Sequence, residues 1–252
     1  MEHLGVEMKE PYTYLEWDKE KISRLWDFES HWAPAQNEYF SKMVGAGIVN
    51  FLKKHTPLKG RVIDYGCGPG YLVHQLLKTT TAKVYGVDLS KESADKANVK
   101  FFGYHLWYKA KQYKGGVLPY ESNYFDQILF VETIEHMTEA DLDTILFEFK
   151  RILKPGGQLF ITTPNNEDLA SNMVFCPCCS QVFHKYQHMR AFTKDSLCGV
   201  MSARGYVTQQ CGTTDFNDHQ CTPTRQIINA VKSVLVRSSA PKPHLYWLGK
   251  KA

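Results

Sequence analysis

A strand that runs into a glycine-rich turn is the feature that most constrains this chain. Residues 62–70 read VIDYGCGPG, an apolar run that carries an acid, Asp64. Three glycines follow in the pattern G-x-G-x-G, at Gly66, Gly68 and Gly70. Glycines at such positions let the backbone turn sharply and let a ligand lie directly against it. A tight turn with a purely structural role is the alternative, and the neighbouring residues decide between the two.

An acid at the end of the next strand favours a ligand. The run VYGVDLS carries Asp88, about 20 residues after the first glycine, where a carboxylate can accept hydrogen bonds from both hydroxyls of a ribose. A dinucleotide fingerprint would also need a third glycine at position 71 to make room for a pyrophosphate, and this chain has Tyr71 there. The two strands therefore predict a site for a ribose-bearing ligand and disfavour a nicotinamide dehydrogenase.

The order of the elements predicts the fold class. From about residue 61 onward, short β-rich runs alternate with helical patterns, which is typical of an α/β protein built from βαβ units on a parallel sheet. Thr138 begins a T-x-x-D capping pattern, and apolar residues then recur at helical spacing until KPGG ends the helix. Further helical stretches cover residues 40–52 and 225–236. We expect seven strands, at residues 61–66, 83–89, 99–105, 125–131, 156–164, 205–213 and 244–250.

Composition excludes several classes of protein. The 252 residues, 43% of them hydrophobic, suffice for one large domain with its own core, so we expect a single domain over residues 1–252. A formal charge of +4, with basic residues mostly scattered, is too mild to require nucleic acid. No apolar run approaches the ~18 residues that span a bilayer, and the start lacks a signal-peptide core, so we expect a cytoplasmic protein without a membrane partner. The odd number of cysteines indicates reduced thiols rather than a secreted disulfide framework.

These motifs resemble those of the class I S-adenosylmethionine-dependent methyltransferases, which carry an acid in the first strand, G-x-G-x-G, and an acid ending the second strand. The resemblance covers roughly residues 40–250, because LPYESNYFDQILFVETIEHM is similar to the family's fourth-strand region and RILKPGGQLFITTPN to the helix, turn and fifth strand that follow. It implies a Rossmann-like sheet in the order 3-2-1-4-5-7-6, with the last strand antiparallel and helices on both faces. It also implies S-adenosyl-L-methionine as cofactor, bound near Asp64, Gly66, Cys67, Gly68, Gly70, Asp88, Leu89, Val131 and Glu132.

Two parts of the chain depart from that family pattern. Many relatives bind the adenine amino group through an acid after the third strand, whereas this chain has aromatics and lysines there, with Tyr104, Trp107 and Tyr108 as candidates for stacking. Residues 1–55 form an aromatic-rich segment that belongs to no expected strand. We expect it to be a helical cap over the site, with simple packing of its aromatics as the alternative.

A cluster of cysteines and histidines follows the fifth strand, in an expected insertion over residues 166–192. The run CPCCSQVFHKYQH contains C-x2-C-x4-H-x3-H, made by Cys176, Cys179, His184 and His188. Thiolates and imidazoles are ligands that zinc prefers, and four protein ligands would close a tetrahedral structural site. The alternative is an ordinary loop with reduced cysteines, in which the histidines are free to contact substrate.

Methyl transfer needs little covalent help from a protein, because the sulfonium already activates the methyl group and the acceptor must only be held in line. A general base assists a hydroxyl acceptor, and histidine suits that role near neutral pH. The candidates are His184 and His188, if they do not bind zinc, and His136 of the E-H pair.

We therefore expect an enzyme that moves a methyl group from S-adenosylmethionine to a small molecule, with oxygen as the expected acceptor atom. A methyltransferase acting on RNA or protein is the first alternative, although no N-P-P-Y or D-P-P-Y run for chemistry on base nitrogens is present. A non-catalytic scaffold that keeps the cofactor and is stabilised by zinc is the second. The oligomeric state is left open by these motifs.

Overall fold

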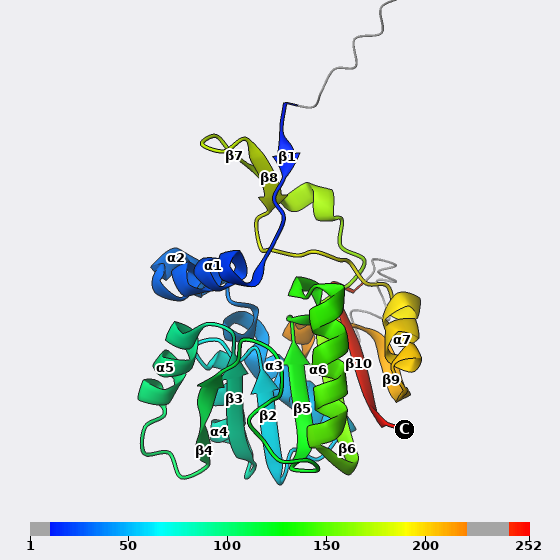
Figure 1. Cartoon of the computed structure of the whole chain (residues 1–252). Coiled ribbons are helices and arrows are strands. Elements are labelled where there is room, and N and C mark those ends of the chain that lie inside the picture. Colours follow the sequence, from blue (N-terminus) through cyan, green and yellow to red (C-terminus); the bar gives the residue numbers. More distant parts are fainter. Residues whose placement is uncertain (1–10, 221–241) are drawn as a thin grey trace, which may run out of the picture.

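The computed structural model describes residues 11–220 and 242–252. Its body is a seven-stranded sheet in the order β4-β3-β2-β5-β6-β10-β9 (Figure 1). Strands β2 to β6 pair in parallel, and β10 is antiparallel to both of its neighbours. This is the predicted order 3-2-1-4-5-7-6, so the fold class is confirmed. The strands are β2 (Arg61–Tyr65), β3 (Lys83–Asp88), β4 (Trp107–Gln112), β5 (Phe125–Val131), β6 (Leu153–Pro164), β9 (Tyr206–Thr214) and β10 (His244–Lys251).

The central strands are buried on both faces, which explains their nearly continuous apolar sequences. In β5 six of the seven residues are buried, and in β2 four of the five are. The parallel register places Asp64 opposite both Gly86 and Leu129. The carboxyl ends of β2, β3 and β5 therefore lie side by side at one edge of the sheet, where ligands of open α/β sheets bind.

Two layers of helices cover the sheet, one on each face. One apolar core joins the sheet to α3 (Phe40–His55), α4 (Tyr71–Thr79) and α5 (Lys91–Lys100). The core on the opposite face joins it to α6 (Glu139–Ile152) and α7 (Lys194–Ala203). The predicted start of α6 is confirmed, because the Thr138 side chain accepts a hydrogen bond from the backbone N–H of Asp141.

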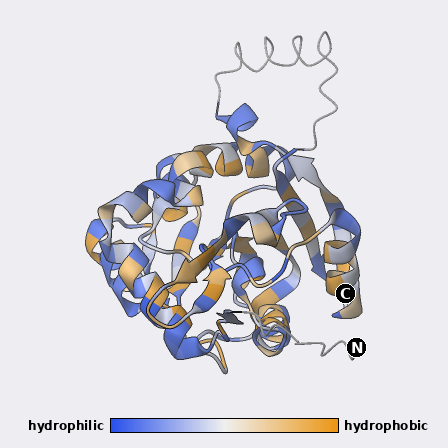
Figure 2. Cartoon of the chain, turned by 90° about the horizontal axis from the view of Figure 1, so that it is seen from above, coloured by the Kyte–Doolittle hydropathy of each residue, from blue (hydrophilic) through white to orange (hydrophobic). Residues whose placement is uncertain are grey.

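The N-terminal helices and a small second sheet lie beyond the carboxyl edge of the large sheet (Figure 1). Helices α1 (Lys19–His31) and α2 (Ala33–Glu38) lie across this edge, and the view from above in Figure 2 shows their mixture of hydrophilic and hydrophobic residues. The second sheet has the order β1-β8-β7 and projects further out. Its strands are β1 (Thr13–Tyr14), β7 (Met173–Cys176) and β8 (Gln181–His184). Short 3-10 helices complete the described chain at Ile134–His136 (η1), Leu169–Asn172 (η2) and Phe216–His219 (η3).

One predicted strand is wrong. Residues 99–105 do not form a strand, because α5 continues to Lys100 and a turn with Gly103 at φ +85° follows. The third strand of the predicted order is instead β4, which begins at Trp107. The apolar residues at 99, 101 and 102 resemble those of a strand. The buried residues of this region, Ala94, Ala97 and Phe101, instead recur at the spacing of one helix face.

The expected helix at residues 225–236 lies outside the described residues. Among the residues that the structure describes, no helix combines the length and the apolar character needed to cross a membrane.

Candidate functional site

A cavity of about 520 Å³ lies at the carboxyl ends of β2, β3 and β5. The glycine turn and strand ends form one part of its lining, with Gly66, Gly68, Asp88, Leu89, Val131 and Glu132. The N-terminal helices form an apolar wall, with Ile22, Leu25, Trp26, Tyr39, Phe40 and Met43. The segments after β5 and β8 complete the lining with Glu135, His136, Gln187 and His188. The cavity thus joins six of the nine predicted cofactor residues to two of the three candidate bases.

The turn after β2 depends on its three glycines for its backbone conformation. Gly66 and Gly68 have φ values of +81° and +50°, in the left-handed region that favours glycine. A Cβ atom added at Gly66 would lie 2.5 Å from the hydroxyl oxygen of Thr133. Gly70, at φ +84°, is the N-cap of α4. The helix therefore directs its N-terminus, which favours negative charge, toward this turn.

Asp88 binds the glycine turn and also faces the cavity. The backbone N–H of Gly68 donates to one carboxylate oxygen and that of Ser90 to the other, both at 2.8 Å. Burial raises the pKa of Asp88 to about 6, although these two hydrogen bonds act in the opposite direction. Each oxygen keeps a further lone pair, so the carboxylate can still accept a ligand hydroxyl.

Asp64 has a different position from the other predicted cofactor residues. Its side chain is 2% exposed and is not part of the cavity lining. Burial, and then the charge of Asp88, raise the pKa of Asp64 to about 8. Cys67 and Gly70 also lie outside the lining, Cys67 as a buried thiol. These residues support the turn rather than face the cavity.

The N-terminal helices are attached directly to this edge of the sheet. The Ser90 hydroxyl, at the N-cap of α5, donates to Asp27 of α1 at 2.6 Å. The ring of Tyr39 packs near Gly68 and lies 5.5 Å from the ring of Tyr71. The segment that was expected to be a cap therefore contacts the glycine turn itself.

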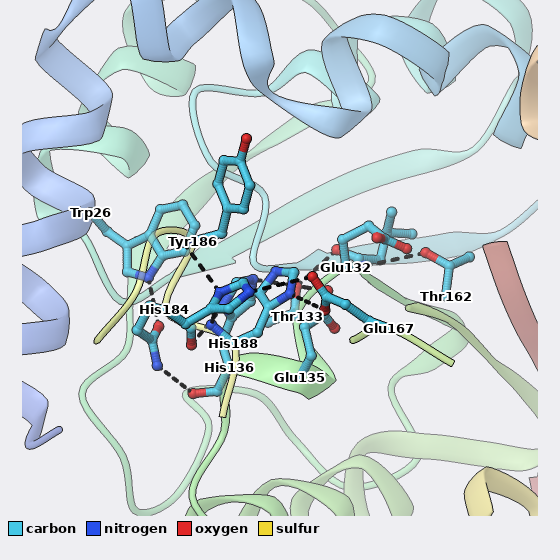
Figure 3. A network of polar contacts seen from close by, with 12 residues as sticks. Trp26, Glu132, Thr133, Glu135, His136, Thr162, Glu167, His184, Tyr186 and His188 are labelled. Carbon is cyan, nitrogen blue, oxygen red and sulfur yellow. Dashed lines mark hydrogen bonds and ion pairs between the residues drawn. The ribbon is translucent and has the colours of Figure 1, made fainter. Parts of the chain in front are cut away.

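A cluster of titratable groups borders the cavity (Figure 3), and four of its members, Glu132, Glu135, His136 and His188, belong to the lining. The imidazole of His188 lies between those of His184 and His136, with ring centroids 4.6 and 4.8 Å away. The cluster contains three glutamates and three histidines drawn from two segments of the chain. Glu132 follows β5, and Glu135 and His136 lie in η1; Glu167, His184 and His188 come from residues 166–192.

The carboxyl groups after β5 are unusual because Glu135 is buried, Glu132 is half-buried, and both are poorly paired. Glu132 has a left-handed φ of +44°, a conformation that costs free energy in a non-glycine residue and is frequent at functional sites. Burial raises its pKa to about 8. Glu135 is 1% exposed, neither of its oxygens has a hydrogen-bond partner among the described residues, and burial raises its pKa well above the usual value. Both carboxyls are therefore stabilised in their protonated form.

The loop after β8 is held in place from several sides. Gln187, at φ +61°, accepts a hydrogen bond from the Trp26 indole at 3.1 Å and donates one to the backbone carbonyl of His136 at 2.9 Å. The N–H of Met189 donates to the carbonyl of Glu135 at 2.9 Å. Burial, and then the charge of His188, lower the pKa of His136 to about 3, so this imidazole is neutral at physiological pH.

Glu167 connects the two histidines of the loop. Its carboxylate lies 2.5 Å from His188 Nδ1 and 3.4 Å from His184 Nε2. The candidate ligand atoms of Glu167, His184 and His188 all lie within 4.8 Å of one another, as do those of Glu135, His136 and His188. Such spacing allows the groups to share protons or a cation.

The four residues expected to bind zinc do not converge, which corrects the predicted ligand set. In the β7–β8 hairpin Cys176 pairs with Gln181 beside the turn, whereas His184 pairs with Met173 at the other end. Cys179 is exposed in the turn, and His184 is buried. The spacing C-x2-C-x4-H was compatible with a compact knuckle, but the extended strand β8 separates the imidazole from the thiols by three residues of strand.

Sequence reasoning missed Glu167. It lies three positions beyond β6 and directly before Asp168, and no motif marked it. The only signal was its place after the carboxyl end of a parallel strand, where ligand-contacting side chains gather. The aromatic residues suggested for adenine stacking, Tyr104, Trp107 and Tyr108, do not line the cavity, whereas Tyr113 and Lys114 do.

Comparison with known proteins identifies relatives of this architecture. A family model described as "Methyltransferase domain" matches residues 36–210. The ubiquinone biosynthesis O-methyltransferase of Coxiella burnetii is 29% identical over 152 residues, which are 59% of this chain and 63% of that protein. The human mitochondrial ubiquinone biosynthesis O-methyltransferase is 26% identical over 200 residues, which are 74% of this chain and 53% of that protein. The chain thus spans about half to two thirds of the length of these curated relatives.

Solved structures share the fold at low sequence identity. A putative Haloferax volcanii methyltransferase, solved in complex with the activator Trm112, has a TM-score of 0.63 at 17% identity and covers 90% of this chain and 97% of its own. An Aquifex aeolicus S-adenosylmethionine-dependent methyltransferase has a TM-score of 0.55 at 17% identity, over 93% of this chain and 98% of its own.

Proposed function

The chain belongs to the methyltransferase domain family, and on that basis we propose that it transfers a methyl group from S-adenosyl-L-methionine to a hydroxyl oxygen of a small molecule. One observation carries this proposal. A single cavity is lined both by Asp88 and the glycine turn and by histidines and glutamates of the titratable cluster. That arrangement can bring a methyl donor and an acceptor hydroxyl together in one enclosed space.

The cofactor end has the features that the methyl donor requires. Asp88 would accept the ribose hydroxyls, and Gly66 and Gly68 would let the donor's amino-acid part lie against the backbone. Val131 and Glu132, which follow on β5, would lie beside its methionine part. When bound, the sulfonium of the donor supplies an activated methyl group, so the chain's own task is to bind, orient and exclude water.

The acceptor end favours a partly apolar molecule with a hydroxyl group. Ile22, Leu25 and Trp26 of α1 give this part of the cavity an apolar wall, while the histidine cluster faces it with polar groups. The curated relatives are named ubiquinone biosynthesis O-methyltransferases, which supports an aromatic or quinone-like acceptor methylated at oxygen. We propose a small-molecule acceptor and neither a nucleic-acid nor a membrane partner.

These roles suggest how the chain is divided into a domain body, a cap and an insertion. We propose one methyltransferase domain in which residues 1–55 act as a cap and residues 166–192 as an insertion that shapes the acceptor end. A structural zinc has support only from the two thiols near the hairpin turn, Cys176 and Cys179. Two thiolates supply half of a tetrahedral site, so zinc has no part in the proposed reaction.

The experiment is a transfer assay with S-adenosylmethionine labelled in its methyl group. Hydroxylated aromatic and quinone-type molecules would be offered in parallel with total RNA and a mixed peptide pool, each at low and high salt. We expect label in the small molecules, accompanied by S-adenosylhomocysteine. Label in RNA that falls with added salt, or label in peptides alone, would replace the small-molecule acceptor by a macromolecule.

The scaffold alternative makes a different prediction in the same assay. A chain that binds the cofactor without using it would yield no S-adenosylhomocysteine with any acceptor above the rate without enzyme, although it would still bind that product in calorimetry.

A further inference from the structure

His188 and Glu167 are arranged as a hydrogen-bonded pair at the edge of the cavity. His188 Nδ1 lies 2.5 Å from Glu167 Oε2. The His188 side chain is 11% exposed and lines the cavity, whereas Glu167 is 13% exposed and lies outside the lining. The carboxylate is therefore behind the imidazole as seen from the cavity (Figure 3).

This contact determines which ring nitrogen can accept a proton. An ionised carboxylate can only accept hydrogen bonds, so His188 Nδ1 must be the donor. A neutral imidazole carries one N–H, which leaves the lone pair on Nε2, at the far side of the ring from Glu167. A histidine held in this tautomer has the orientation required of a general base.

His184 lies beside the same carboxylate without a hydrogen bond to it. Its Nδ1 accepts hydrogen bonds from the backbone N–H groups of Tyr186 at 3.3 Å and of His188 at 3.1 Å. The proton of its neutral ring is then on Nε2, which lies 3.4 Å from Glu167 Oε1 but has no hydrogen-bond partner among the described residues. Of the two imidazoles, His188 is therefore the one that Glu167 holds by a hydrogen bond.

We propose that His188 is the general base for the acceptor hydroxyl and that Glu167 is the residue that positions it. This inference rests on the proposed function. The acceptor O–H proton passes to His188 Nε2 while the acceptor oxygen forms a bond to the methyl carbon. The bond between that carbon and the donor sulfur breaks, and its electron pair stays on sulfur. The imidazolium that results is stabilised by the Glu167 carboxylate and later releases its proton to water.

The test compares Glu167→Gln with Asp168→Asn, a matched control. Both variants replace a carboxylate by an amide in the same short segment. Asp168 is exposed, and among the described residues its carboxylate accepts a hydrogen bond only from the backbone N–H of Ala170. We expect Glu167→Gln to lower kcat by about 10²–10⁴-fold, the usual contribution of general base catalysis, with the KM for the methyl donor within twofold of wild type. His188→Ala should cost a similar factor, and the double variant should cost little more than either. Asp168→Asn should leave kcat within twofold.

A second readout does not depend on turnover. The 15N shifts of the His188 ring should report the Nδ1–H tautomer in the wild type and in Asp168→Asn. In Glu167→Gln an amide that can donate removes this preference, so the shifts should move toward the Nε2–H form.

Three results would overturn the proposal. The first is an unchanged kcat in folded Glu167→Gln, and the second is an unchanged His188 tautomer in that variant. The third is one tightly held divalent metal ion per purified chain that is lost in Glu167→Gln, since His188 would then bind the metal. Failure of the proposed function has a different signature: the wild type would transfer no methyl group, while the tautomer measurement would still report the pair.

Discussion

The backbone N–H of Gly68 donates a 2.8 Å hydrogen bond to the carboxylate of Asp88, across the ends of two adjacent parallel strands. The glycine turn and Asp88 therefore form one unit before any ligand binds. Because the other oxygen of Asp88 accepts from Ser90 at 2.8 Å, the carboxylate is oriented by two backbone groups rather than by flexible side chains. Such preorganisation reduces the ordering required on binding.

Replacement of Asp88 tests this unit. Asp88→Ala removes the proposed hydrogen bonds to the ribose and the two from the backbone N–H groups of Gly68 and Ser90. Hydrogen bonds to charged groups contribute about 1.5–3 kcal/mol. Titration calorimetry with S-adenosylhomocysteine should show affinity weaker by roughly 10- to 150-fold. Asp88→Asn should lose less, because the amide oxygen can still accept from one N–H. An affinity unchanged in Asp88→Ala would remove this residue from the site.

The turn itself should not tolerate a side chain. Gly66→Ala places a methyl group 2.5 Å from Thr133 Oγ1 at a φ of +81°, so both a close contact and an unfavourable backbone conformation oppose it. We expect a loss of stability of about 1–3 kcal/mol in urea unfolding, together with weaker binding of S-adenosylhomocysteine. The control is Gly199→Ala in α7, where an added Cβ contacts nothing within 4 Å. That variant should be as stable as the wild type or more stable, by up to about 1 kcal/mol. Equal effects of the two substitutions would contradict this account of the turn.

Burial of Asp64 predicts a pH dependence of stability. Its pKa is about 8 in the folded chain and near 3.8 in the unfolded one, so between these values the folded chain keeps a proton that the unfolded chain has released. The contribution of Asp64 to the free energy of unfolding is therefore fully present below about pH 4. As pH rises toward 8, the free energy of unfolding falls by up to about 1.4 kcal/mol per pH unit. Asp88 and Glu132, with pKa values raised to about 6 and 8, act in the same direction.

Urea unfolding at pH 5, 6, 7 and 8 tests whether the free energy of unfolding falls as pH rises. The wild type should lose stability as pH rises, and Asp64→Asn, which cannot ionise, should lose less. Asp126→Asn is the control. Hydrogen bonds from the backbone N–H of Arg61 and then from Lys154 lower the pKa of that carboxyl despite its partial burial, so its titration lies below this window. That variant should be destabilised by a similar amount at each pH. A slope in Asp64→Asn as steep as in the wild type would show that Asp64 is not the group responsible.

The thiols near the hairpin turn should be dispensable for binding of the cofactor. Cys176 and Cys179 lie in or beside the β7–β8 turn and do not line the cavity. Replacement of both by serine should leave the affinity for S-adenosylhomocysteine within twofold of wild type. Elemental analysis of the same samples would report bound zinc. One zinc per chain that disappears with the double substitution, together with lost binding, would restore a structural zinc site to the account.

The sheet and the cofactor end could be predicted from sequence because each rests on a local signal. The continuous apolar runs of β2 and β5 identified buried parallel strands, and three glycines with positive φ values appeared as a short motif. The strand predicted at residues 99–105 was wrong for a local reason as well. Apolar residues at the C-terminal end of α5 resemble those of a strand, and only tertiary packing shows that Phe101 completes a helical face.

The acceptor end could not be predicted in this way because its residues meet only through the topology. Glu167 and His188 are 21 positions apart, and Trp26 reaches the same loop from 161 positions away, through Gln187. No spacing rule describes such contacts. The C-x2-C-x4-H pattern was misleading because it describes spacing along the chain. The extended strand β8 places the histidine at one end of the hairpin and the cysteines at the other.

The most direct test of the central claim is a calorimetric titration of the wild-type chain with S-adenosylhomocysteine, with reduced nicotinamide adenine dinucleotide titrated in parallel. A methyltransferase site at the glycine turn predicts saturable binding of one S-adenosylhomocysteine per chain and no heat from the nicotinamide cofactor. Binding of the nicotinamide cofactor, or no binding of S-adenosylhomocysteine to folded protein, would contradict it.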